Sequence, residues 1–506
     1  MHSERDRLVL HRVDLRLACM KKDYSLFNSW HSNWSELKVV VLGLGVSGFS
    51  VADTLAELGS KLLVVSEDAE AELLDILDVL DVEHITGDQA EGLPKRVIEF
   101  EPDLIITSPG VRPEHPLLQW ASSREIPIWI DVDLAWRLRD KTAKAADWIA
   151  VTGTNGKTTT VQLVEAMIQT QGLRAIACGN IGVPILDAIR DPVGLDALVV
   201  ELSSFQLHYL GHIEPFASAV LNLANDHLDW HGSFEVYGET KSKIYQNTSV
   251  ACIYNLNDLA TEKMVENAEV IEGARAVAFT TGLPSRSQVG FVEDILCDRA
   301  FIDDRANSAL EIATLEDLSQ IGVLTPHLMA NVAAATALAR AYSISPESIR
   351  TAIRTFKLDA HRMELVAEVN GVSWIDDSKA TNPHAAAASL NSFENIIWIV
   401  GGLLKGVDIS EVIESYAGRL KAAIVIGLER ENVLDSLGKH APGIQLIEID
   451  NSDAVMHDAV KAALGLAKTG DTVLLAPAAA SMDQFKDYAD RGRKFAEQVH
   501  FQLGVS

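Results

Sequence analysis

The sequence predicts an α/β protein with parallel sheets, organised in three domains. Short runs of β-branched and apolar residues alternate along the chain with amphipathic stretches, as in strands that are joined by helices. Glycine-rich turns follow two of these runs directly. The length of 506 residues corresponds to about three domains of roughly 150 residues. We therefore expect an N-terminal extension over 1–35 and domains over 36–146, 147–356 and 357–506.

The first domain is expected to contain four strands and an acidic helix. Between residues 67 and 83 every charged residue is acidic and leucines recur at helical spacing, which indicates a solvated helix. The extension over 1–35 shows little hydrophobic pattern, and the sequence does not decide whether the protein starts at Met1 or at Met20. The predicted strands cover the apolar runs 38–42, 61–65, 103–107 and 126–130.

The second and third domains show the same alternation of strands and helices. The segments 141–146 and 355–359 are the expected hinges between the domains. Strands are predicted over 148–152, 197–200 and 217–221 in the second domain, and over 396–400, 422–426 and 472–475 in the third.

Composition and charge exclude several classes of protein. Hydrophobic residues make up 48% and charged residues 23%, which is the balance of a folded globular chain, and the net charge of −28 disfavours nucleic acid or anionic membrane as a general partner. No apolar run reaches the roughly 18 residues of a membrane helix. The mixed charges of residues 4–23 are unlike a signal peptide. Four widely spaced cysteines fit a reducing cytoplasm and argue against a zinc site; they are Cys19, Cys178, Cys252 and Cys297.

The first glycine motif is Gly43-Leu-Gly45-Val-Ser-Gly48, between a predicted strand and a helix. Glycines allow the backbone to turn tightly and to approach a diphosphate at the helix N-terminus. The motif therefore predicts a nucleotide-diphosphate site, and the alternative is a tight turn without a ligand. Ser66-Glu67-Asp68, at the end of the second strand, lies where dinucleotide enzymes contact a ribose.

The second glycine motif, Thr152-Gly-Thr-Asn-Gly-Lys-Thr-Thr-Thr160, is more specific. Backbone N–H groups of such a loop surround phosphates, a lysine at position 157 reaches the terminal ones, and the hydroxyl of Thr158 can bind Mg²⁺. The motif departs from the general P-loop pattern because Val151 stands where the first glycine is usual, and Gly153 supplies the turn instead. A nucleoside triphosphate site is predicted here.

Carboxylates and a histidine follow the next two strands of the central domain. Glu201 ends the run 197–200, and Asn225-Asp-His-Leu-Asp229 follows the run 217–221. Polar residues at the carboxyl ends of parallel strands face the ligand crevice, and Glu201 beside Thr158 would suit a Mg²⁺ ion. His227 taken alone does not predict a metal ligand, because a single histidine can equally well hydrogen bond to the local backbone.

Together these motifs resemble the Mur ligases, the ATP-dependent amino-acid-adding enzymes of peptidoglycan precursor synthesis. The resemblance extends from about Lys38 to the C-terminus. It rests on the segments 152–159, 179–182, 201–207, 225–229 and 241–245 of the central domain, and on 359–364, 376–382, 401–405 and 477–485 of the third.

The resemblance implies a three-domain fold and a reaction. The fold would comprise a Rossmann-like N-terminal domain, a central P-loop-type ATPase domain and a Rossmann-like C-terminal domain. Residues 201–206, 377–382 and 481–486 are most similar to members that add D-glutamate to UDP-N-acetylmuramoyl-L-alanine through an acyl phosphate, and no Asp-Asn-Pro-Arg is present. The resemblance also implies a cytoplasmic protein that acts as a monomer.

The resemblance further implies roles in ATP binding and catalysis. Two Mg²⁺ ions are expected, one held by Thr158 and Glu201 and the other by His227 and a carbamylated Lys241. From the residues alone, Lys241 would be an exposed helix lysine. The expected ATP contacts are Gly153, Thr154, Asn155, Gly156, Lys157, Thr158, Thr159, Asn331, Arg362 and Asp377, and the expected catalytic residues are Lys157, His227, Lys241, His361 and Arg362.

The substrate contacts implied by the resemblance come from all three domains. The family often has His-Asn-x-x-Asn at the adenine side, and here leucine follows His327, so only the second asparagine, Asn331, is kept. Tyr488 stands in place of a phenylalanine, and Ser66-Glu67-Asp68 leaves the uracil contacts open. The expected contacts are Gly43, Val46, Ser47, Gly48, Ser108, Pro109 and Gly110 for the uridine diphosphate, Asn180 and Ser203 for the muramoyl-alanine, and Lys379, Thr381, Lys405, Ser481 and Tyr488 for D-glutamate.

Three alternatives stay open at this point. A nicotinamide-dependent oxidoreductase would use the first glycine loop but leaves Lys157, Glu201 and His227 without a role. A nucleotide-switched binding protein would keep the P-loop without turnover, and the presence of all four residues Lys157, Glu201, His227 and Lys241 argues against it. A ligase that adds another amino acid to another acceptor is the nearest alternative.

Overall fold

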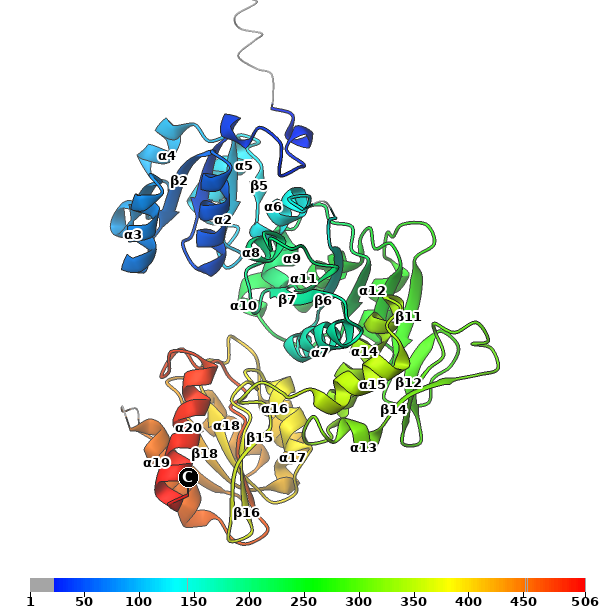
Figure 1. Cartoon of the computed structure of the whole chain (residues 1–506). Coiled ribbons are helices and arrows are strands. Elements are labelled where there is room, and N and C mark those ends of the chain that lie inside the picture. The colour runs from blue at the N-terminus through cyan, green and yellow to red at the C-terminus, as the bar shows by residue number, and fades with distance from the viewer. Residues whose placement is uncertain (1–21, 143, 451, 453, 506) are drawn as a thin grey trace, which may run out of the picture. The chain divides into compact units, whose positions relative to one another are not determined.

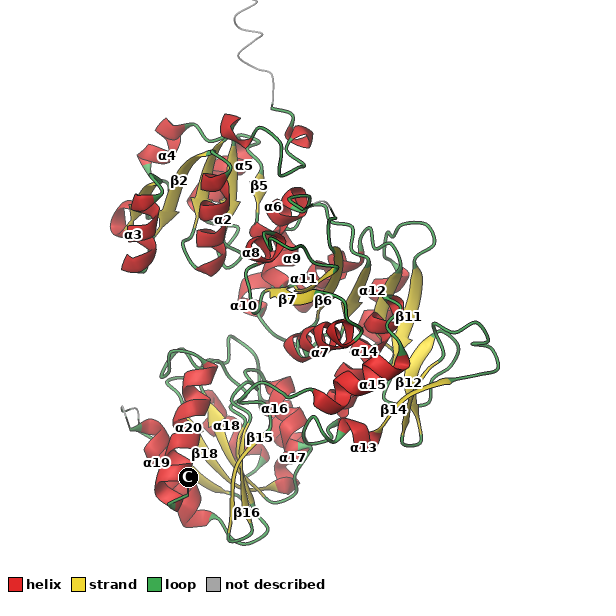
Figure 2. Cartoon of the chain, viewed as in Figure 1, coloured by secondary structure: helices red, strands yellow, loops and turns green. Residues whose placement is uncertain are grey.

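The computed structural model describes residues 22–142, 144–450, 452 and 454–505, which contain three sheets (Figure 1). Helices lie along both faces of the sheets, as Figure 2 shows by colour. The chain forms two compact units. The first comprises the described part of 1–146 with 183–195 and 209–213, and the second comprises the described parts of 147–182, 196–208 and 214–506.

The N-terminal sheet has five parallel strands in the order β3-β2-β1-β4-β5. This order is that of a Rossmann-type sheet, in which the chain crosses to the other side of the first strand after the third. Its strands are β1 (Lys38–Leu42), β2 (Lys61–Ser66), β3 (Glu83–Thr86), β4 (Leu104–Thr107) and β5 (Ile128–Trp129), and its helices are α2 (Val46–Glu57), α3 (Ala71–Val79), α4 (Lys95–Phe100), α5 (Pro116–Ser123) and α6 (Asp131–Leu138).

The central sheet has nine strands in the order β14-β13-β12-β11-β10-β9-β6-β8-β7. Strands β6 to β12 are parallel, and β13 and β14 are antiparallel additions at one edge. The strands are β6 (Asp147–Thr152), β7 (Ala175–Gly179), β8 (Ala197–Glu201), β9 (Ala217–Val220), β10 (Ala251–Asn255), β11 (Arg275–Phe279), β12 (Gln288–Val292), β13 (Ile295–Asp298) and β14 (Leu310–Thr314). The helices are α7 (Lys157–Thr170), α8 (Ile185–Ile189), α9 (Ser204–Tyr209), α10 (Leu228–His231), α11 (Phe234–Ser242), α12 (Leu259–Glu266), α13 (Leu315–Leu318), α14 (Pro326–Ala341) and α15 (Pro346–Thr355).

The C-terminal sheet has six strands in the order β15-β16-β20-β17-β18-β19, and only β15 runs antiparallel to its neighbour. Its strands are β15 (Glu364–Val369), β16 (Val372–Asp376), β17 (Ile396–Gly401), β18 (Leu420–Ile426), β19 (Gln445–Glu448) and β20 (Thr472–Leu475), and its helices are α16 (Pro383–Leu390), α17 (Ser410–Tyr416), α18 (Glu431–His440), α19 (Val455–Leu466) and α20 (Tyr488–Leu503).

The α/β fold class and the three-domain architecture are confirmed, but the expectation of purely parallel sheets is wrong at two edges. β12, β13 and β14 form an antiparallel meander, and β15 and β16 form a hairpin. The hairpin turns at Asn370 and Gly371, both with positive φ, which is the backbone that this dipeptide favours.

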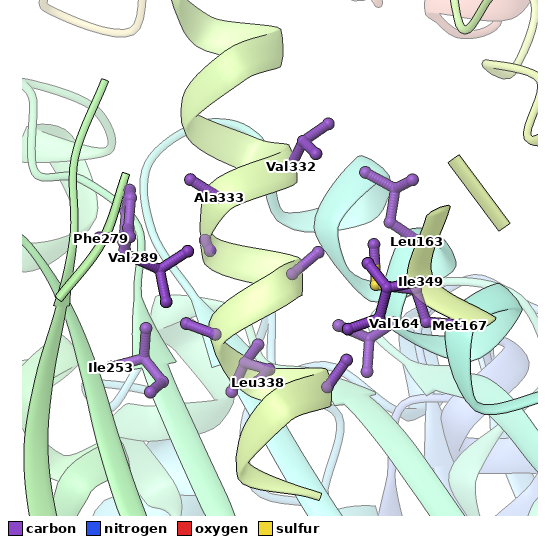
Figure 3. Close-up of a cluster of buried hydrophobic side chains, with 14 of the residues drawn as sticks. Leu163, Val164, Met167, Ile253, Phe279, Val289, Val332, Ala333, Leu338 and Ile349 are labelled. Atoms are coloured by element: carbon purple, nitrogen blue, oxygen red, sulfur yellow. The ribbon is translucent and has the colours of Figure 1, made fainter. Parts of the chain in front are cut away.

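The alanine-rich helix α14 fixes the start of α7 in the central domain. Thr325 caps α14 by accepting a hydrogen bond from Leu328 N, and Pro326 occupies its first turn. Figure 3 shows Ile253, Phe279 and Val289 of the sheet on one side of α14, and Leu163, Val164 and Met167 of α7 with Ile349 of α15 on the other. Small side chains on α14 allow this close packing, which holds the P-loop helix rigidly on the sheet.

Residues from outside the expected boundaries complete the first unit. Lys22 and Tyr24 hydrogen bond to Asp103, and Trp34 is buried, so the described part of the expected extension packs on the N-terminal domain. Arg190 forms an ion pair with Glu57 at 2.9 Å. In the described part of the chain, no helix has both the length and the hydropathy that a membrane span requires.

Candidate active site

The P-loop connects β6 to α7 and packs against the start of α14. Gly156 has φ +82°, and a Cβ at this position would lie 2.3 Å from Asn331 Oδ1. Only glycine fits both the left-handed backbone and this close approach. Asn331 thus lies directly beside the loop, as the resemblance implies for an ATP contact.

Lys157 folds back onto its own loop. Its Nζ donates to Gly153 O at 3.0 Å and to Thr154 O at 2.8 Å. Burial lowers the pKa of Lys157, and the carboxylates of Glu201 and Asp226 partly offset this. The lysine thus lies at the position where terminal phosphates are expected.

Thr158, Glu201 and Asn180 form one hydrogen-bonded group at the edge of the sheet. Thr158 Oγ1 donates to Glu201 Oε2 at 3.0 Å, and Asn180 Nδ2 donates to Glu201 Oε1 at 2.9 Å. Glu201 is only 2% exposed. A hydroxyl and a carboxylate are hard oxygen donors of the type that Mg²⁺ prefers, so these residues fit the first expected ion.

His227 lies at the start of α10 with its Nε2 3.7 Å from Asp226 Oδ2. Burial lowers the pKa of His227 to about 4. The ring is therefore neutral at pH 7, which is the form that binds metals. Its backbone is left-handed, with φ +53°.

Lys241 is buried, which contradicts its interpretation from the residues alone as an exposed helix lysine. Only 2% of it is accessible, and its Nζ donates to Gly153 O at 2.9 Å and lies 4.7 Å from the centre of the Tyr237 ring. Burial lowers its pKa well below the ordinary value, and the charge of Lys157 lowers it further. The structure thus places Lys241 at the P-loop.

A cavity of about 130 Å³, here called the P-loop cavity, brings residues of the central and C-terminal domains together. A second cavity of about 480 Å³ shares Asn222, His327, Asn331 and His384 with it. Asn222 and His384 were not predicted, and no motif marks them. The predicted residues that line the P-loop cavity are Asn155, Gly156, Thr159, Asn331, Arg362, Asp377 and Lys379.

Asn382 links the P-loop to the C-terminal domain, and sequence reasoning did not single it out. Its Nδ2 donates to Asn155 Oδ1 at 3.1 Å and to Asp226 Oδ2 at 3.2 Å. Asn155 also lies 3.0 Å from His384 Nδ1. Asn382 belongs to the motif that carried the resemblance, and it also caps α16.

The residues expected to contact D-glutamate lie on three loops of the C-terminal domain. Lys379 Nζ lies 3.7 Å from the centre of the Tyr488 ring, and burial lowers the pKa of Lys379 to about 8. Leu403 and Ala480 exchange backbone hydrogen bonds of 2.9 Å, which brings the loops of Lys405 and Ser481 together. Thr381, Lys405 and Ser481 line neither of the two cavities.

His361 does not line the P-loop cavity, although the neighbouring Arg362 does. The Nδ1 atom of His361 instead lies 2.6 Å from Asp376 Oδ2. Asp377, on the other side of the motif, accepts a hydrogen bond from the Ser389 hydroxyl, and burial raises the pKa of Asp377 to about 6.

The first unit holds a separate cavity of about 1240 Å³, lined by the first glycine loop. A Cβ at Gly48 would lie 2.0 Å from Gly43 O, so only glycine fits at this position in the first turn of α2. Ser66 Oγ accepts from Leu44 N and donates to Asp68 O, so this side chain shapes the loop. Of the residues expected to contact the uridine diphosphate, four line this cavity: Gly43, Val46, Ser108 and Gly110. The other three, Ser47, Gly48 and Pro109, do not line it. Its lining also includes Arg112 and His115, which were not predicted.

Comparison with known protein families identifies all three domains. Residues 37–130 match the family model described as Mur ligase MurD-like, N-terminal domain. Residues 151–339 match the Mur ligase middle domain, and residues 361–479 match the Mur ligase, glutamate ligase domain.

Curated relatives align over nearly the whole chain. The UDP-N-acetylmuramoylalanine–D-glutamate ligase of Leifsonia xyli subsp. xyli is 54% identical over 501 residues, covering 96% of this chain and 97% of the relative. The enzyme of the same name from Streptomyces coelicolor is 47% identical over 480 residues, covering 94% and 100%. The crystal structure of the UDP-N-acetylmuramate–alanine ligase of Thermotoga maritima shares the fold, with a TM-score of 0.55 at 17% identity over 92% of this chain and 100% of that chain. The chain therefore belongs to the Mur ligase family.

Proposed function

We propose that this chain is an ATP-dependent ligase that adds D-glutamate to UDP-N-acetylmuramoyl-L-alanine in peptidoglycan precursor synthesis. The observation that carries the proposal is the P-loop itself: Thr158 bonds to Glu201 beside Lys157, and the flanking loop residues Gly156 and Thr159 line a cavity together with Arg362 and Asp377. The full-length relatives from Leifsonia and Streptomyces carry the name of this reaction. All of these residues come from one chain, and in this proposal the enzyme works as a cytoplasmic monomer.

The reaction needs ATP because a carboxylate is a poor electrophile in water. A carboxylate oxygen of the acceptor attacks the γ-phosphorus, the bond to the β–γ bridging oxygen breaks, and ADP leaves. The amine of D-glutamate then attacks the acyl carbon, loses a proton, and displaces phosphate. Phosphoryl transfer depends mainly on positioning and on neutralisation of charge, which is the role of Lys157 and Arg362 here.

The donor groups fit two Mg²⁺ ions. Thr158 and Glu201 would hold one, and His227 with a carbamate on Lys241 would hold the other. When bound, Mg²⁺ neutralises phosphate charge. A carbamate forms when the neutral amine of a lysine adds CO₂ and releases one proton. Burial lowers the pKa of Lys241 well below its ordinary value, which favours the neutral amine and supports this modification.

The remaining residues take the roles that follow from their domains. Asn331 and Asp377 bind the adenosine and Arg362 the phosphates. The loop from Gly43 to Gly48, with 108–110, binds the uridine diphosphate, and Asn180 and Ser203 line the path of the muramoyl-alanine. D-Glutamate is held by Lys379, Thr381, Lys405, Ser481 and Tyr488, on the C-terminal domain.

The proposal is tested by measuring ADP and phosphate release together with the mass of the product. We expect turnover only when ATP, UDP-N-acetylmuramoyl-L-alanine and D-glutamate are all present, with a product that contains one added glutamyl group. Nicotinamide binding in place of ATP would support the oxidoreductase alternative. Tight ATP binding without any turnover would support the non-catalytic one.

A further inference from the structure

The loop that carries Arg362 has an unusual backbone. His361 and Met363, on either side of Arg362, have φ values of +66° and +49°, in the left-handed region that non-glycine residues rarely adopt. Such a conformation persists only where surrounding contacts hold it. Arg362 between them lines the P-loop cavity.

Two consecutive carboxylates at the end of β16 hold the residues on both sides of Arg362. Asp376 Oδ2 lies 2.6 Å from the His361 ring, and Asp377 Oδ1 accepts a hydrogen bond from Met363 N at 3.2 Å. When Asp376 is ionised its carboxylate only accepts hydrogen bonds, and the Nδ1 atom of His361 is then the donor. The loop is thus fastened at two points, one on each side of the arginine.

The bond between His361 and Asp376 is built into the packing of the domain. Asp376 is fully buried, and its Oδ1 accepts a second hydrogen bond from Ser378 N at 2.9 Å. A Cβ at Gly492 of α20 would lie 2.3 Å from His361 Nδ1 and 2.7 Å from Asp376 Oδ2. The helix therefore leaves room for this pair only because residue 492 is glycine.

Backbone contacts fix the same histidine further. His361 N donates to Glu364 Oε2 at 2.8 Å, and His361 O accepts from Lys379 N at 3.2 Å. The donor atoms of His361, Glu364 and Asp376 lie within 4.8 Å of one another, as in a metal site. Because all three already bond within this loop, the group serves as an anchor.

We infer that Asp376 is a positioning residue for ATP: through His361 it fixes the loop and so directs Arg362 into the P-loop cavity. His361 is likewise a positioning residue, because it holds the loop and does not itself line the cavity. The inference rests on the proposed function, which places the phosphates of ATP at Arg362. The two neighbouring carboxylates thus have different places: Asp377 lines the P-loop cavity and Asp376 does not. The inference gives Asp376 an indirect role, which the sequence motif alone does not indicate.

A double-mutant cycle tests this inference. Binding of a non-hydrolysable ATP analogue and the KM for ATP are measured for Asp376→Ala, Arg362→Ala and the double variant. If Asp376 acts through Arg362, Asp376→Ala weakens binding by about ten-fold in the native background but by less than about two-fold when Arg362 is already absent. Thermal unfolding of each variant verifies that it is folded.

Two further variants separate positioning from general stability. Asp376→Asn keeps an oxygen for Ser378 N and an amide that donates to the other tautomer of His361, so it should restore most of the binding. Asp471→Ala removes another buried carboxylate of the same domain, just before β20. It should lower stability and leave analogue binding unchanged in both backgrounds.

The outcomes distinguish the inference from the proposed function. Equal losses from Asp376→Ala with and without Arg362 would overturn the inference alone, as would Asp376→Asn behaving like Asp376→Ala. Unchanged analogue binding in Arg362→Ala would overturn the placement of the phosphates at Arg362, and the inference with it.

Discussion

Lys157 and Lys241 direct their side-chain nitrogens at a single carbonyl oxygen. Gly153 O accepts a hydrogen bond from Lys157 at 3.0 Å and from Lys241 at 2.9 Å. Burial lowers the pKa of both lysines, and the charge of Lys157 lowers that of Lys241 further. Two ammonium groups this close repel each other, so the arrangement favours Lys241 as a neutral amine.

The first prediction is that Lys241→Ala is nearly inactive and recovers part of its activity with acetate or formate. The loss should be on the order of 100-fold or more because the carbamate proposed as a charged Mg²⁺ ligand is missing, and a small carboxylate would restore oxygens at that place. Turnover is measured over a series of carboxylate concentrations. Lys263→Ala, an exposed lysine of α12, is the control and should show neither effect. Ordinary activity of Lys241→Ala would show that the lysine is not needed for the reaction.

The second prediction concerns Lys157. Lys157→Ala should lose at least about 3 kcal/mol of transition-state stabilisation, roughly 100-fold or more in kcat, because a charge-assisted phosphate contact is removed. Its fold should survive, since the residue is the first of α7 and does not belong to the apolar core. Phosphate release and thermal unfolding are compared with those of Lys461→Ala, an exposed lysine of α19. Near-normal phosphate release by folded Lys157→Ala contradicts the ATP assignment.

The third prediction is a pH dependence of nucleotide binding. Burial lowers the pKa of Lys379 to about 8, so this lysine is charged below that pH and neutral above it. Besides its proposed role at D-glutamate, Lys379 lines the P-loop cavity, so the affinity for a non-hydrolysable ATP analogue should fall as the pH rises through about 8. Lys379→Arg should stay charged and remove the fall. An unchanged pH profile in Lys379→Arg would assign the fall to another group.

The fourth prediction concerns Lys405. Lys405→Gln should raise the KM for D-glutamate by about ten-fold or more and change the KM for ATP little, because its proposed partner is a carboxylate of the amino acid. The two KM values are measured on the same preparation. Equal increases in both would place Lys405 at the nucleotide.

The sequence predicted the features that depend on local chemistry. The strands beginning at Lys38 and Lys61 and the strand that leads into Lys157 needed only short apolar runs, and all three are present. Glycine turns follow the first and the third of them. The Asn370-Gly371 turn was an equally local signal of a hairpin that the prediction of parallel sheets did not use.

The rest depends on contacts between distant segments. The burial of Lys241 arises because α11 packs against the loop after β6, which helical spacing within α11 cannot reveal. Asn382 and the pairing of His361 with Asp376 likewise join residues whose proximity only the folded C-terminal domain creates. Arg112 lies in a loop without a motif, so nothing in the sequence marked it as lining the first cavity.

The central claim is the addition of D-glutamate to UDP-N-acetylmuramoyl-L-alanine, and phosphate release from ATP, scanned over amino acids with this acceptor, tests it most directly. A site with fixed cations and hydroxyl donors discriminates strongly against ligands that leave those groups unpaired. D-Glutamate should therefore be used, while L-glutamate and D-alanine should fail by about 100-fold or more. Preferred use of L-lysine or diaminopimelate would contradict the account.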